Sequence, residues 1–142
     1  APAAPGVRYA QIRTSIAFPL PEAGDVIPFD SVEFDSGGCG TFNPGGTWTL
    51  AAGVYLLSSF FRSDDGVNCN VAIREQGSGQ IAGASFNPLP APPVFSAGGA
   101  SASGPVLAYG GEVIQVWGYI DGNGTGAYAR FQILRLGDGP PP

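Results

Sequence analysis

The chain has 142 residues, a length that suits one globular domain with a single core. Hydrophobic residues make up 44% of it, which is enough to form a core and argues against a disordered chain. Its net charge of −5 argues against a nucleic-acid partner, and no run of about 18 apolar residues predicts a membrane span. Histidine is absent, which removes the commonest general base and metal imidazole, and we expect no cofactor.

The 23 glycines and 14 prolines separate compact apolar runs, and this punctuation favours many short strands over helices. We predict an all-β, antiparallel jelly-roll sandwich of about 8–10 strands. Residues 1–7 form a Pro-rich arm, residues 8–136 the single domain, and residues 137–142 a Pro-rich tail. Because the chain contains no methionine, we expect an initiator or a longer leader to have been removed.

The first half of the domain alternates apolar and polar residues. Residues 8–18 place Ala10 and Ile12 on one face, and residues 27–34 predict a strand with Val32 and Phe34 facing inward. A turn at 43–46 (NPGG) precedes a short strand that carries Trp48.

The second half contains the most apolar segments. Strands are predicted at 53–62, 69–75, 106–109, 112–121 and 127–136. Residues 76–105 are rich in glycine, serine and proline, and we expect an extended loop there because proline is excluded from central strands.

Residues 53–62 and 112–121 are apolar on both strand faces, which is typical of a strand that is covered from both sides. We expect a buried seam between identical copies of the chain to cover the second face. Its candidate residues are Tyr55, Leu57, Phe61, Trp117 and Tyr119. The alternative is that the loop at 76–105 covers some of them.

Cys39 and Cys69 are the only cysteines. Either they form a disulfide that closes a loop of about 30 residues, or they remain two buried thiols.

Oxygen-bearing side chains at Asp121, Asn123 and Thr125 resemble the start of a calcium loop, although a hairpin turn explains Asp-Gly and Asn-Gly better. The acidic pairs Glu33/Asp35 and Asp64/Asp65 show no sign of a cleft, and no serine has a histidine base. We therefore predict that the protein is not an enzyme.

The order of the motifs resembles the superfamily of complement C-one-q globular heads and tumour necrosis factor. The resemblance rests on residues 32–34 (VEF), 46–50 (GTWTL), 53–56 (GVYL), 71–77 (VAIREQG), 106–116 (VLAYGGEVIQV) and 131–134 (FQIL). The chain departs from the family pattern at Ala51 and Ala52, where a proline is expected, and at 134–136 (LRL).

The resemblance implies a tight threefold trimer. Our first functional hypothesis is a bacteriophage capsid decoration protein on the virion surface, a trimer that clamps the major capsid protein or another virion surface without nucleic acid or membrane. The alternative is a fibre knob or an extracellular head domain. It would bind a glycan or protein receptor through Trp48, the loop at 86–95 and the turn at 121–126.

Overall fold

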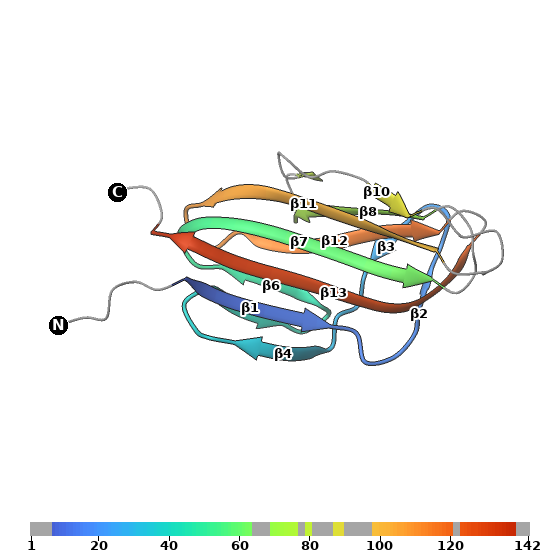
Figure 1. Cartoon of the computed structure of the whole chain (residues 1–142), viewed down its shortest axis with the longest axis horizontal. Helices are drawn as coiled ribbons and strands as arrows, with labels where there is room; N and C mark the ends of the chain where they lie inside the picture. Colours follow the sequence, from blue (N-terminus) through green and yellow to red (C-terminus); the bar gives the residue numbers. More distant parts are fainter. Residues whose placement is uncertain are drawn as a thin grey trace.

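The computed structural model describes residues 7–63, 69–76, 79–80, 87–89, 98–120 and 123–138. These residues form thirteen β-strands and no helix, so none of them belongs to a helix that could cross a membrane. All strand pairs are antiparallel and build two sheets that pack face to face as a sandwich, as Figure 1 shows. The predicted all-β jelly roll is confirmed.

The first sheet has seven strands. Six of them follow the order β10-β11-β7-β13-β1-β4, and the seventh, β2, pairs with the first residues of β13. Strands β1 and β13 lie side by side, so the beginning and the end of the domain meet in the middle of this sheet. The strand bounds are β1 Arg8–Arg13, β2 Phe18–Leu20, β4 Ser31–Asp35, β7 Gly53–Ser63, β10 Asn87–Leu89, β11 Gly98–Ala108 and β13 Gly124–Gly137.

The second sheet has six strands in the order β5-β6-β12-β8-β9, and β3 pairs with β12. Its strand bounds are β3 Asp25–Val26, β5 Gly40–Asn43, β6 Thr47–Leu50, β8 Cys69–Glu75, β9 Gly79–Gln80 and β12 Val113–Ile120. The predicted turn at 43–46 joins β5 to β6, where Gly46 N donates to Asn43 O at 3.2 Å and Gly45 has a φ of 91°.

Apolar side chains from the inner faces of both sheets fill the sandwich. The largest fully buried ones are Trp48, Tyr55, Phe18, Phe61, Phe131, Ile12, Leu20, Ile27, Leu50, Leu57, Ile73 and Ile114. Burial raises the pKa of Tyr55 to about 12, so its hydroxyl stays protonated and donates to Ala51 O at 2.8 Å. The Trp48 indole donates to Cys39 O at 3.0 Å, so both polar tips in this core have partners.

Several strands differ from the sequence prediction, and the short strands β9 and β10 lie within the segment 76–105 that was expected to be a loop. Strand β11 begins at Gly98, inside the segment expected to be a loop, because pairing with β7 along its whole length outweighs the low strand propensity of its glycines and serines. Strand β4 lies at the sheet edge. Phe34 pairs with the outward-facing Gln11 and is 51% exposed, so the prediction that it faces inward is wrong, whereas Val32 pairs with the inward-facing Ile12 but stays 45% exposed at the edge.

Cys39 and Cys69 are both buried and are not joined by a disulfide, so of the two alternatives the structure shows the pair of buried thiols. Cys69 pairs with Ile120 at one end of β12, whereas Cys39 accepts a hydrogen bond from Ala51 N beyond the other end. At about 3.3 Å per residue, the length of β12 separates them by roughly 25 Å, well beyond the roughly 7 Å that a disulfide spans between Cα atoms.

Candidate interaction faces

The sandwich has two outward faces with different chemistry. We call the outer face of the seven-stranded sheet the network face, and its outward side chains come from β1, β4, β7, β11 and β13. We call the outer face of the six-stranded sheet around Trp117 the tryptophan face, and its outward side chains come from β8 and β12.

An apolar band crosses the network face near the end where β1 begins and β13 ends. In one cross-strand row Pro105 pairs with Leu56, Leu56 with Leu134, and Leu134 with Tyr9. Val54 and Leu107 form the next pair, 36% and 46% exposed, and Leu56 is 41% exposed. Exposed apolar side chains that adjoin across strands form a patch, which distinguishes them from the isolated exposed leucines of most surfaces.

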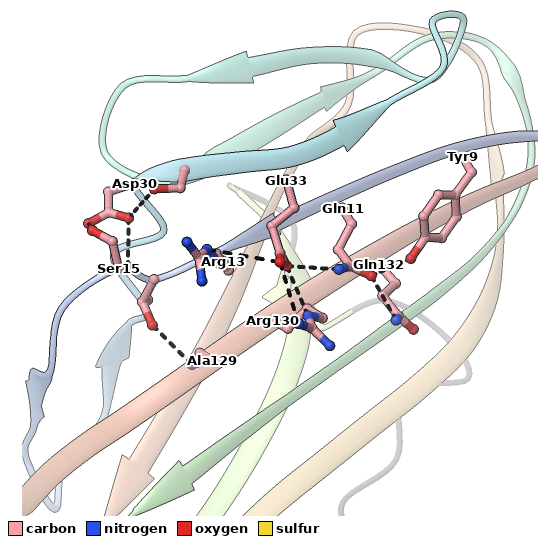
Figure 2. A network of polar contacts seen from close by, with 11 residues as sticks. Tyr9, Gln11, Arg13, Ser15, Asp30, Glu33, Ala129, Arg130 and Gln132 are labelled. Atoms are coloured by element: carbon pink, nitrogen blue, oxygen red, sulfur yellow. Dashed lines mark hydrogen bonds and ion pairs between the residues drawn. The ribbon is translucent and has the colours of Figure 1, made fainter.

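A hydrogen-bonded polar network lies next to this band, because Gln11 and Gln132 pair two residues along the same strands from Tyr9 and Leu134. Figure 2 shows the network. Ser58 Oγ donates to Gln132 Oε1 at 3.1 Å, and Gln132 Nε2 donates to Gln11 Oε1 at 2.9 Å. The Tyr9 hydroxyl donates to the same Gln11 oxygen. Gln11 Nε2 donates to Glu33 Oε1 at 2.7 Å, which extends the network to the edge strand β4. Each amide thus has a partner within the chain.

Two arginines complete the network at Glu33. Arg130 donates to both carboxylate oxygens, at 2.9 and 3.4 Å, and Arg13 Nε lies 3.9 Å from Oε2. Burial by itself opposes ionisation of Glu33, but the hydrogen bonds of Gln11 and Arg130 and the two positive charges outweigh it and lower the pKa. Glu33 is therefore a firmly ionised carboxylate that has an unusually complete set of partners for a surface residue.

The local chain geometry explains why Glu33 reaches the network. The pairing of β1 with β4 shifts register between Gln11 and Ile12, so a bulge inserts Glu33 between the residues opposite them. Asp30 fixes the start of β4, since its carboxylate accepts from Ser15 N at 2.8 Å and Ser15 Oγ at 2.7 Å. These hydrogen bonds lower the pKa of Asp30 despite the opposing effect of desolvation.

A hollow of about 260 Å³ opens on the same face between β11, β7 and β13. Its lining residues are Ser58, Ser59, Phe60, Ser101, Ala102, Ser103 and Gln132. The β11 residues in this lining have small side chains, whereas Phe60 and Gln132 contribute the largest ones.

The tryptophan face is closed by contacts within the chain. The Arg74 guanidinium lies 4.2 Å from the centre of the Trp117 ring, and Tyr119 packs edge-on against the same ring at 5.9 Å. The Tyr119 hydroxyl accepts a hydrogen bond from Asn70 Nδ2. Gly24 lies directly against the indole, since a Cβ at this position would be 1.7 Å from Trp117 Cζ2.

Three of the five predicted seam residues lie in the core. Tyr55, Leu57 and Phe61 are 0–1% exposed and point between the sheets, so a second chain cannot contact them. The expectation that they face outward is wrong, because β7 alternates strictly and its outward residues are Val54, Leu56, Ser58, Phe60 and Arg62. Trp117 and Tyr119 do face outward, but on the opposite side of the molecule.

The structure also places the other predicted site residues. Asn123 Oδ1 accepts a hydrogen bond from Glu22 N at 2.8 Å, which fits the hairpin-turn interpretation, whereas Asp121 lies outside the described residues. No group of three acidic or cysteine side chains suited to a metal occurs among the described residues. Trp48 is buried and cannot bind a receptor directly. The predicted binding loop at 86–95 lies almost wholly outside the described residues, apart from the backbone of β10.

Sequence reasoning missed Gln11, Ser58 and Gln132, which lie in three strands far apart along the chain. A faint signal exists, since each is a polar residue between two buried ones in an otherwise apolar strand. Only the pairing of the first strand with the last shows that they meet.

Comparison with known proteins identifies the fold. No protein-family model and no curated protein sequence matches the chain. Two crystal structures of murine APRIL are similar: the one at pH 5.0 has a TM-score of 0.64 at 15% identity, and the one at pH 8.0 has 0.60 at 12%. Each alignment covers 92% of this chain and 100% of the APRIL chain. These neighbours confirm the predicted tumour-necrosis-factor-like jelly roll; at this identity they show the fold alone.

Proposed function

We propose that this protein is a non-catalytic assembly module that forms a homotrimer through its network face. The observation that carries the proposal is the apolar band around Leu56 next to a polar network that is satisfied within the chain. A buried polar group is costly only when it loses its partners, so these amides can be covered by a second chain without a large desolvation penalty.

The network face supports assembly better than the tryptophan face does. On the network face, Leu56 and Leu107 present more than two fifths of their surface to solvent. On the tryptophan face, the indole of Trp117 is already covered by Arg74, Tyr119 and the Gly24 backbone. Covering the network face removes these exposed leucines from water, and burial of apolar surface is the main driving force of association.

As the role of the trimer we propose decoration of a protein shell, with the major capsid protein of a bacteriophage as partner and the virion surface as location. Three copies of one weak contact would bind a symmetric shell with high avidity. The net charge of −5 supports a protein partner over a nucleic acid.

A receptor-binding head domain, on a fibre or secreted into the extracellular space, is the second candidate function. It is favoured by the tryptophan face, where Trp117, Tyr119 and Arg74 would remain outward after assembly through the opposite sheet. Aromatic residues and arginine are enriched in recognition hot spots.

Light scattering across a dilution series tests the assembly. The expected mass is three times the 14.4 kDa of one chain, falling toward a single chain only at high dilution. A single-chain mass at every concentration would rule out the trimer. Co-sedimentation of the trimer with phage capsids or with receptor-bearing cells then distinguishes the two roles.

A further inference from the structure

We propose that the trimer closes by a knob-in-hollow contact, in which Phe34 of one copy enters the serine-lined hollow between β11 and β7 of the next. This inference rests on the proposed function and deepens it, since it names the two surfaces that meet. The occupant of the hollow is a second copy of this chain.

A ring of three requires two different surfaces on each copy. A twofold contact joins a patch to itself and stops at two copies, whereas a threefold ring needs a head-to-tail contact between complementary patches. The network face offers such a pair at opposite sides. Phe34, 51% exposed, projects from the edge strand β4, and the hollow lies across the sheet at β11 and β7.

The two features lie in one cross-strand row. Phe34 pairs with Gln11, Gln11 with Gln132, Gln132 with Ser58, and Ser58 with Ser103. The knob and the hollow are therefore at the same height along the strands. In the proposed ring the threefold axis runs along the strands. Rotation about such an axis preserves height, so Phe34 of one copy would arrive level with Ser103 of its neighbour.

The size and the setting of the hollow also fit an aromatic ring. Its volume of about 260 Å³ exceeds the roughly 150 Å³ of a protein cavity that holds a benzene molecule. Phe60 supplies an aromatic wall against which a second ring can pack. Phe34 is held in place by the Tyr9 ring, whose centroid lies 5.6 Å away, so little side-chain freedom remains to be lost on binding.

Two variants separate the knob from the hollow. Phe34→Ala removes the knob, and Ser103→Trp fills the hollow from an exposed position on β11. Each is expected to weaken trimer formation roughly 30-fold or more, the effect of losing an interface hot spot. Val32→Ala is the matched control, because this side chain is 45% exposed on the same strand but pairs with the inward-facing Ile12, so it should leave the trimer intact.

Mixing the two defective variants gives the decisive readout. At a concentration where each alone is monomeric by light scattering, the intact Phe34 of the Ser103→Trp chain can enter the intact hollow of the Phe34→Ala chain. The reverse contact is blocked, so the mixture should form a heterodimer of twice the 14.4 kDa chain mass and stop there.

Circular dichroism first establishes that both variants are folded. A mixture that stays monomeric would overturn the knob-in-hollow contact, and so would single variants that assemble like the wild-type protein. A wild-type chain that is monomeric throughout would refute the proposed trimer itself, so the two failures are distinguishable.

Discussion

The two outward faces of this sandwich contain similar types of residue but differ in whether their apolar side chains are exposed to solvent. Both carry aromatic side chains, arginine and amides, but on the tryptophan face the arginine stacks on the ring and a glycine fits beneath it. On the network face the polar groups bond to one another and leave the leucines of the apolar band uncovered. A surface that satisfies its polar groups and exposes its apolar ones is suited to burial by a second chain, whereas the indole on the tryptophan face is already covered within the chain.

A carboxylate placed in the apolar band should give the largest effect. Leu56→Glu would bury an unpaired charge in the trimer, which costs several kcal/mol, so we expect the dissociation constant to rise at least roughly 100-fold by light scattering. Gln115→Glu is the matched control on the tryptophan face, where the pairing of Gln115 with Arg74 places the new carboxylate beside a cation. If both variants assembled equally well, the network face would not be the seam.

The tryptophan face should instead govern the stability of the single chain. Gly24→Ala combines a φ of 89° with a clash against Trp117, and we expect a loss of about 2–4 kcal/mol in the free energy of unfolding. Gly45→Ala has a φ of 91° but open space around its Cβ, so it should lose only about 1–2 kcal/mol. Urea denaturation measures both, and equal losses would mean that the indole is not tightly held.

Acid should weaken the network face through Glu33. Because its pKa in the folded chain is lowered, the network contributes stability above the ordinary value of 4.5 and loses it as the pH falls through the lowered pKa. We expect the free energy of unfolding of the chain, measured by urea denaturation, to fall when the pH is taken from 6 toward 3.5. Glu33→Gln should lower the free energy of unfolding at pH 6 and make it less sensitive to acid; an unchanged pH profile would contradict a role for this carboxylate.

The smallest effect is expected for the arginine on the tryptophan face. Arg74→Leu removes the stacking on Trp117, a contact that contributes about 1 kcal/mol. It should change the tryptophan fluorescence and lower the stability slightly, without altering the mass in solution. A loss of assembly in this variant would mean that the trimer contact lies on the six-stranded sheet, against the proposal.

The sequence alone predicted the all-β class and the strands around β7, β8 and β12. Apolar runs between glycine and proline turns indicate where strands begin and end, so these strands could be predicted. Which face of β7 points into the core could not be predicted. Tyr55, Leu57 and Phe61 on one face and Val54, Leu56 and Phe60 on the other are equally apolar, and a period of two cannot say which face meets the second sheet.

The hydrogen-bonded network on the network face could not be predicted from the sequence for a different reason. Gln11 and Gln132 meet because the first and last long strands pair, and Glu33 joins them because a bulge shifts β4 by one residue. Neither event leaves a local pattern in the sequence. For a similar reason the sequence left the disulfide open, since the spacing of Cys39 and Cys69 along the chain does not show that they lie near opposite ends of β12.

The most direct test of the account is hydroxyl-radical footprinting of the wild-type chain, compared between a dilute and a concentrated sample. Both faces carry oxidisable rings, so each serves as the internal reference for the other. We predict that Tyr9 and Phe34 become protected at high concentration while Trp117 and Tyr119 react equally in both samples. Protection of Trp117 and Tyr119 with no change at Tyr9 and Phe34 would contradict assembly through the network face.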